Sequence, residues 1–180
     1  MTQPRLLGIS GSLRAGSTNT LLLKEAARLF GDASFTLADI RMPLYDGDLE
    51  TAEGMPAEAA QLHEQMAAAD AIIFATPEYN SNLPGVLKNA LDWVSRKAPK
   101  PMEGKPVAIM SAAAGRTGGA RSQFSLRHCL TPFRPRVMQG PEMMVASSQA
   151  AFAENGRLRD EKSQEILAEM MADLRAMIDA

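Results

Sequence analysis

The residues best suited to chemistry lie together in the segment Gly8–Asn19, which holds four hydroxyl side chains, one arginine and three glycines. The segment follows a short apolar run, Arg5–Ser10, and leads into an amphipathic stretch, Thr18–Phe30. A loop between a strand and a helix presents free N–H groups, and the helix dipole favours an anion there. The composition therefore predicts a phosphate site. An ordinary turn capped by Ser17 is the alternative interpretation.

We compared this segment with three known motifs, for dinucleotides, for triphosphates and for the nucleophile of hydrolases. The segment lacks the G-x-G-x-x-G pattern of dinucleotide sites. It has Gly11, Gly16 and Thr18 where the triphosphate pattern requires them, but Ser17 replaces the lysine of that pattern. Ser12 replaces the last glycine of the hydrolase elbow G-x-S-x-G. These departures favour a terminal phosphate dianion, bound by hydroxyls, main-chain amides and Arg14.

Two further segments follow apolar runs in the same way. Thr76–Pro84 is confined by proline at both ends, and its Asn80 can offer donors and an acceptor to a planar heterocycle, with Tyr79 as an aromatic surface. Ser111–Gly119 is rich in small residues, which permit close approach of the backbone to a flat ring. Taken alone, each segment is also consistent with a plain turn.

The elements that must position these loops alternate between strand and helix. Short apolar runs and helix-length amphipathic stretches follow one another through a single domain, residues 1–180. Such an order predicts an α/β fold with parallel strands, helices on both faces, and ligands beyond the carboxyl ends of the strands. We expect strands at Arg5–Ser10, Ser34–Ile40, Ala71–Thr76, Val107–Ala112 and within Arg136–Val145, and helices at Thr18–Phe30, Met55–Ala69, Pro84–Ser95, Gly119–Leu130 and after Asp160. The acidic stretch Asp46–Glu58 predicts a solvated loop.

Composition and charge exclude several classes of protein. The chain has 180 residues and a net charge of −2, and no apolar run approaches the roughly 20 residues of a membrane span. The N-terminus shows no signal-peptide pattern and Cys129 is the single cysteine, so we expect a cytoplasmic protein. Segment 96–136 carries nine basic residues and one acid, which predicts either steering of an anionic ligand or a solvated basic face. Sparse aromatic residues argue against nucleic acid.

Metal and nucleophilic chemistry find little support. His63, His128 and Cys129 are the only soft ligands, and no C-x-x-C or H-x-x-x-H spacing exists, so we expect no metal site. A triad built from Ser10 and His128 lacks the elbow motif. Cys129 is more typical of a buried small hydrophobe than of a reactive thiol.

Read together, the three loops resemble the NAD(P)H-dependent FMN reductases of the flavodoxin-like fold, a group that includes bacterial quinone and chromate reductases. The resemblance spans Leu6 to Leu130. It is carried by G-S-L-R-A-G-S-T-N at 11–19, P-E-Y-N-S-N-L-P-G-V-L-K-N-A-L-D-W at 77–93 and G-R-T-G-G-A-R-S-Q at 115–123. It implies a three-layer sandwich with a five-stranded parallel sheet in the order 2-1-3-4-5 and FMN at the switch point.

The resemblance also implies which residues bind the cofactor. The FMN phosphate would be held by Ser10, Ser12, Arg14, Ser17, Thr18 and Asn19. The isoalloxazine ring would be lined by Pro77, Glu78, Tyr79 and Asn80. Its other edge would be approached by Ser111 and Gly115, with Gly118 and Gly119 shaping the loop.

The implied activity is hydride transfer from NADPH or NADH to bound FMN, followed by transfer to a small acceptor such as a quinone, a flavin, a nitro compound or a metal oxyanion. No side chain is then needed as acid, base or nucleophile. Arg116 and Arg121 are candidates for the NADPH 2′-phosphate, or else solvated loop residues. The resemblance further implies a homodimer or homotetramer. The rival interpretations are a flavodoxin-like electron carrier and a non-enzymatic FMN-binding module.

Overall fold

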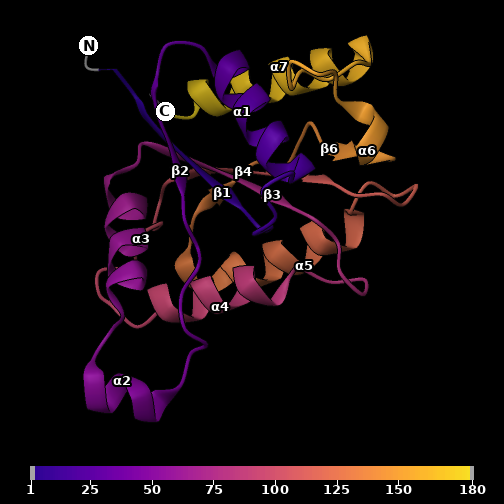
Figure 1. The fold of residues 1–180 in the computed structure, drawn as a ribbon. Helices are drawn as coiled ribbons and strands as arrows, with labels where there is room; N and C mark the ends of the chain where they lie inside the picture. The colour runs from indigo at the N-terminus through magenta and orange to yellow at the C-terminus, as the bar shows by residue number, and fades with distance from the viewer. Residues whose placement is uncertain (1–2, 179–180) are drawn as a thin grey trace.

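The computed structural model describes residues 3–178. The expectation of no signal peptide rests partly on residues 1–2, which lie outside this range. The elements alternate as expected (Figure 1). The strands are β1 (Arg5–Ser10), β2 (Ser34–Ala38), β3 (Ala71–Thr76), β4 (Pro106–Ala112), β5 (Arg136–Val137) and β6 (Met143–Val145). The helices are α1 (Thr18–Phe30), α2 (Gly47–Glu53), α3 (Ala57–Ala68), α4 (Gly85–Val94), α5 (Ala120–Leu130), the 3₁₀ turn Thr131–Phe133, α6 (Ser148–Ala151) and α7 (Glu161–Ala176).

One parallel sheet forms the middle layer of the molecule. Its strand order is β2-β1-β3-β4-β5, with β6 also paired to β4, which confirms the predicted order 2-1-3-4-5. Because β1 lies between β2 and β3, the chain reverses its winding direction there, and such a switch point opens a crevice at the carboxyl edge.

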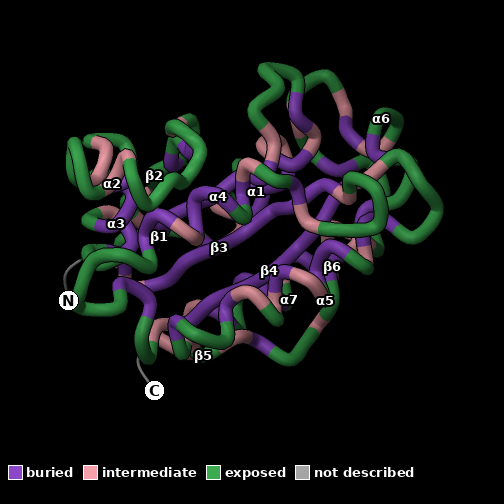
Figure 2. The backbone as a smooth tube through the Cα atoms, turned by 90° about the horizontal axis from the view of Figure 1, so that it is seen from below, coloured by how far each residue is buried: buried purple, intermediate pink, exposed green. Residues whose placement is uncertain are grey.

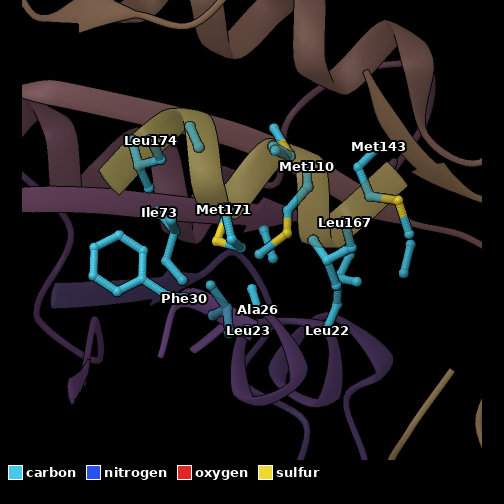
Figure 3. Packing of buried hydrophobic residues seen from close by; sticks show 14 of the residues in the cluster. Leu22, Leu23, Ala26, Phe30, Ile73, Met110, Met143, Leu167, Met171 and Leu174 are labelled. Atoms are coloured by element: carbon cyan, nitrogen blue, oxygen red, sulfur yellow. The ribbon is translucent and has the colours of Figure 1, made fainter. Parts of the chain in front are cut away.

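Helices cover both faces of the sheet, with α1 and α7 on one side and α3, α4 and α5 on the other (Figure 1). Side chains of the central strands alternate between the two layers, since successive strand residues point to opposite faces. Ile73 and Met110 pack with α1 and α7, as Figure 3 shows. Ile72 and Ile109 pack on the opposite side. Both central strands are buried along their whole length (Figure 2), which explains their unbroken apolar sequences.

The expected fifth strand is divided in two. β5 pairs with the beginning of β4 through Arg136, and β6 pairs with its end through Met143. Pro141 lies between them and has no N–H to donate to a ladder, so the pairing is interrupted there.

The acidic stretch 46–58 is not simply a loop, as we had expected, because it contains the helix α2. Asp46 caps this helix by accepting from the N–H of Asp48 at 2.9 Å, and acids in its first turn suit the helix dipole. None of its residues is buried, and it projects from the body of the molecule (Figure 1). Within residues 3–178, no helix has both the length and the apolar character needed to cross a bilayer.

Candidate functional site

Three loops meet at the carboxyl edge of the sheet, where β1, β3 and β4 end side by side. We name them the first loop (residues 11–17), the second loop (77–84) and the third loop (113–119). Their strands end in register, with Ser10 opposite Ala75 and Thr76 opposite Ser111. The parallel topology therefore brings together the three segments that the sequence singled out.

The first two loops touch at Gly11. Its N–H donates to the Ala75 carbonyl at 2.8 Å. A Cβ at this position would lie 3.1 Å from Pro77 Cδ and 3.3 Å from a methyl carbon of Leu87, closer than most real Cβ contacts. A side chain here would therefore push the second loop away, so the close packing of the two loops requires glycine at this position.

A network of hydroxyl groups shapes the first loop. The buried Ser10 hydroxyl accepts from the Thr20 hydroxyl at 3.1 Å and from the Ser12 N–H at 3.3 Å. Ser12 Oγ accepts from the Arg14 N–H at 3.4 Å. Ser17 caps α1 by accepting from the Thr20 N–H at 3.3 Å, so the capping role considered for it is real. Its hydroxyl proton stays available to a ligand.

The same loop keeps unused donors. Within residues 3–178, the N–H groups of Leu13, Ala15 and Gly16 in the loop, and of Thr18 at the start of α1, donate to no protein acceptor, and the exposed guanidinium of Arg14 has no partner. Nothing lies within 4 Å of the place where a Gly16 Cβ would stand. The loop is thus open, rich in donors and placed at the start of a 13-residue helix, which suits a dianion.

An apolar cavity of about 430 Å³ lies between the first and second loops. Its walls include Leu13 and Tyr79, which are 40% and 47% exposed. Arg14 stands at the same cavity, and Pro84 and Val86 close its far side at the beginning of α4. A mostly apolar hollow beside charged and hydroxyl groups is typical of a site for a ligand with a flat body and a charged end.

The second loop is a tight hairpin. Tyr79 and Asn82 exchange both main-chain hydrogen bonds at 3.1 Å. The two residues between them, Asn80 and Ser81, have φ values of 51° and 63°. Such left-handed conformations are uncommon outside glycine, and they hold the exposed Asn80 at the loop tip.

Two side chains tie this hairpin to α5. The Glu78 carboxylate accepts from the Arg121 N–H at 3.1 Å and from its guanidinium at 3.4 Å. Asn82 accepts from the Ser125 hydroxyl one turn further along the helix. The hairpin is therefore fastened at both ends before any ligand arrives.

The third loop is braced from below. The buried Ser111 hydroxyl donates to the Gly118 carbonyl at 2.6 Å and accepts from the Gln123 amide at 2.8 Å, and that amide also donates to the Met143 carbonyl at 2.8 Å. Gly119 has φ 95°, and a Cβ there would lie 2.8 Å from Ser111 Cβ. Gly115 is exposed at the free end of the loop.

Asn19, expected near the phosphate, uses its side-chain amide elsewhere. Its nitrogen donates to the Ala112 carbonyl at 2.8 Å, and its oxygen accepts from the Ala112 N–H at 3.0 Å. The side chain thus joins the first turn of α1 to the end of β4 and holds two of the three loops in place.

Sequence reasoning missed several supporting residues. Arg41 donates to the Leu13 carbonyl at 2.9 Å and pairs with Asp39, which braces the first loop from the segment after β2. Thr20 and Gln123 complete the networks described above. The quoted motifs contain Gln123, but nothing in its sequence surroundings indicates a partner 20 residues away.

The remaining candidate groups lie apart from the three loops or are already engaged. Nε2 of the buried His63 is 3.2 Å and 3.0 Å from the carbonyl oxygens of Lys97 and Pro99, so it donates to the backbone. The Cys129 thiol is half-buried against the α3–α5 layer, and burial raises its pKa, which keeps it protonated. The basic segment is divided between two edges of the sheet: Lys105 and Arg136 brace the amino edge, while Arg121 lies at the carboxyl edge.

A parallel sheet in the order 2-1-3-4-5, with three such loops at its switch point, is the flavodoxin-like arrangement. The solved structure of FerB, a flavoenzyme NAD(P)H:acceptor oxidoreductase from Paracoccus denitrificans, superposes with a TM-score of 0.87 at 31% identity and covers 98% of this chain and 97% of that one. The fold and the site therefore define a flavodoxin-like oxidoreductase.

Sequence comparison identifies the family. The family model for NADPH-dependent FMN reductase matches residues 4–150. An NAD(P)H-dependent FMN reductase from Pseudomonas aeruginosa is 46% identical over 176 residues, 97% of this chain and 95% of that protein. A quinone reductase from Escherichia coli is 41% identical over 145 residues, 78% of this chain and 76% of that protein. The chain belongs to the NADPH-dependent FMN reductase family, and it is an enzyme that uses FMN and NAD(P)H.

The residues of the site fit FMN. The open first loop offers a dianion the free N–H groups and hydroxyls described above, and the neighbouring cavity is apolar on most of its surface. The small residues of the third loop leave its outer side open, since no atom lies within 4 Å of a Cβ built on Gly115.

Proposed function

We propose that this protein catalyses the two-step reduction of a small acceptor, foremost a quinone, by NADPH or NADH at the carboxyl edge of its sheet. Bound FMN would supply the redox chemistry there, namely the capacity to take a hydride from the nicotinamide and to give electrons to the acceptor. The observation that carries this proposal is the group of unpartnered donors in the first loop, next to an apolar cavity whose other wall is the second loop.

At the phosphate end, Ser12, Arg14, Ser17 and Thr18 bind the dianion through hydroxyls and a guanidinium, together with the free N–H groups of the first loop. Ser10 and Asn19 contribute by position: Ser10 is the buried centre of the hydroxyl network, and Asn19 fixes the loop to β4. Charged hydrogen bonds to phosphate are the strong ones, so Arg14 is the largest single contributor.

At the ring end, the second loop supplies a preformed surface. Tyr79 offers apolar area and Asn80 offers its amide at the hairpin tip, while Pro77 is buried beside Gly11 and Glu78 fixes the hairpin on α5. Gly115 of the third loop lines the opposite side, and the buried Ser111 contributes through its hydrogen bond to the Gly118 carbonyl, which holds that loop. The residues orient the reactants and exclude water, and none is required as acid, base or nucleophile.

A quinone is the first acceptor to assay. The related Escherichia coli protein is named a quinone reductase. Free flavins, nitro compounds and metal oxyanions are the other acceptors to be assayed.

We further propose that the protein works as a homodimer or homotetramer in the cytoplasm. Two large apolar side chains, Leu44 and Phe124, are 79% and 64% exposed, and we propose that they take part in the contacts between subunits. A lone, protonated Cys129 suits a reducing compartment. Light scattering at micromolar concentration tests the assembly, and a monomer would contradict it.

The test of function uses purified protein. We expect it to bind FMN, which is detected by quenching of flavin fluorescence and by a higher melting temperature. With FMN bound, it should oxidise NADPH or NADH faster when a quinone is added. A protein that binds FMN but oxidises neither nicotinamide would be an electron carrier, and a protein that gains no stability from FMN would refute the site.

A further inference from the structure

The carboxylate of Glu78 joins the second loop to α5, where its partner is Arg121. The Glu78 side chain is 12% exposed and that of Arg121 is 63% exposed. The ion pair therefore has an acidic member that is mostly buried against α5 and a basic member that reaches into solvent.

The beginning of α5 explains why this carboxylate is held. The cap position is Gly119, which has no side chain to bind the first N–H groups of the helix. Glu78 does so from another loop by accepting the Arg121 N–H at 3.1 Å. A carboxylate at a helix N-terminus is favourable, so this contact with α5 holds the Glu78 side chain in one place.

A fixed negative charge in the loop that faces the ring has an electrostatic consequence. Two-electron reduction leaves the flavin ring with more negative charge near neutral pH, and a neighbouring carboxylate opposes this change. The Arg121 guanidinium, 3.4 Å from the same carboxylate, offsets the opposition. Arg121 therefore acts on Glu78 through two groups. Its backbone N–H holds the Glu78 carboxylate in place, and its side chain balances the charge of that carboxylate.

We propose that Arg121 is a positioning residue that acts through Glu78 and sets how strongly the site prefers reduced over oxidised FMN. This inference rests on the proposed function, since it requires the second loop to face the ring. The Glu78–Arg121 pair would then help to set the midpoint potential of bound FMN, and so the free energy released when an acceptor is reduced. This property is distinct from the affinity of the site for FMN.

The test measures the dissociation constants of oxidised and reduced FMN, or equivalently the midpoint potential, in four variants. Arg121→Met keeps the backbone N–H and removes the charge, so it weakens binding of reduced FMN relative to oxidised FMN by about threefold to tenfold. A tenfold change corresponds to about 30 mV for a two-electron couple. Glu78→Gln keeps an acceptor for the N–H and shifts the ratio in the opposite direction. Arg121→Lys restores most of the parental ratio, and the double variant Glu78→Gln/Arg121→Met lies close to the parent.

Arg116→Met is the matched control, because Arg116 lies in the third loop and makes no ion pair among the described residues. An equal shift in this variant would show a general effect of surface charge and would overturn the proposal. Unchanged affinity ratios in Arg121→Met and Glu78→Gln, in a protein that binds FMN, would show that the pair has only a structural role, and this result would also overturn the proposal. A parent that binds no FMN would instead refute the proposed function, and this inference with it.

Discussion

The first loop and the third loop lie at the same edge of the sheet but are stabilised in different ways. The first loop keeps three main-chain N–H groups and a guanidinium without protein partners among the described residues. The third is braced by the buried side chains of Ser111 and Gln123. An anion site must leave its donors free, whereas a surface that presents a flat ring to a second reactant must hold its shape between the two half-reactions.

This difference predicts that damage to the third loop costs folding stability, while damage to the first loop costs ligand affinity. Buried hydrogen bonds and left-handed glycines belong to the protein whether or not FMN is present. The free donors of the first loop raise the free energy of unfolding only when they bind the anion.

The largest expected effect is that of Gly119→Ala. With φ at 95° and a Cβ 2.8 Å from Ser111 Cβ, the new methyl group is both strained and in collision, so the free energy of unfolding should fall by about 2–5 kcal/mol. Urea denaturation of the FMN-free protein measures it. Gly115→Ala, where no atom lies within 4 Å, is the control and should change stability by less than about 1 kcal/mol. Equal losses in both variants would show that the third loop is not built as described.

Gln123→Ala should cause the second largest loss of folding stability. It removes the donor to Ser111 Oγ and to the Met143 carbonyl and leaves both acceptors buried, which costs about 2–4 kcal/mol of unfolding free energy. The matched control is Gln61→Ala, an exposed position on α3 where about 0.5 kcal/mol or less is expected. Thermal and urea unfolding measure both variants, and a stable Gln123→Ala protein would refute the brace.

Arg14→Ala should separate affinity from stability. Losing one charged hydrogen bond to phosphate costs about 1.5–3 kcal/mol, or about ten- to a hundredfold in the dissociation constant of FMN. The unfolding free energy of the FMN-free protein should not change, because the Arg14 guanidinium, which the substitution removes, has no partner among residues 3–178. Fluorescence titration measures the affinity, with the exposed Arg157→Ala as control. Unchanged FMN affinity would remove Arg14 from the site.

The smallest expected effect is that of salt on the reaction. Arg116 and Arg121 lie at the carboxyl edge and give a local positive field, but the rest of the basic segment faces other surfaces. We expect kcat/KM for NADPH to fall by about twofold to threefold as salt screens this field, while kcat/KM for an uncharged quinone stays constant. A rate with NADPH that does not depend on salt would discard the steering hypothesis.

Local patterns were sufficient to predict the frame of the molecule. The buried runs at 71–76 and 107–112 identify the central strands, and the turns that follow them identify the functional edge. The resemblance named the residues of the three loops. Their roles in cofactor binding, for example that of Tyr79, stay predictions until they are measured.

What the sequence did not indicate depends on contacts between distant segments. Asn19 reads like one more polar residue in a phosphate loop, yet its amide binds Ala112, 93 residues away. Gln123 and Arg41 act on backbone carbonyls that no motif identifies. The helix α2 was missed because it buries nothing and so leaves no apolar period in the sequence.

The alternation of side chains along β3 and β4 has a consequence for how the protein tolerates change. The continuous backbone of the sheet separates two hydrophobic compartments, one containing Met110 and the other Ile109. A void opened under α7 can therefore be refilled only by residues of its own compartment, because an enlarged side chain across the strands points the wrong way. Compensating substitutions should thus occur as pairs within one layer, and the sequences of the two layers can change almost independently.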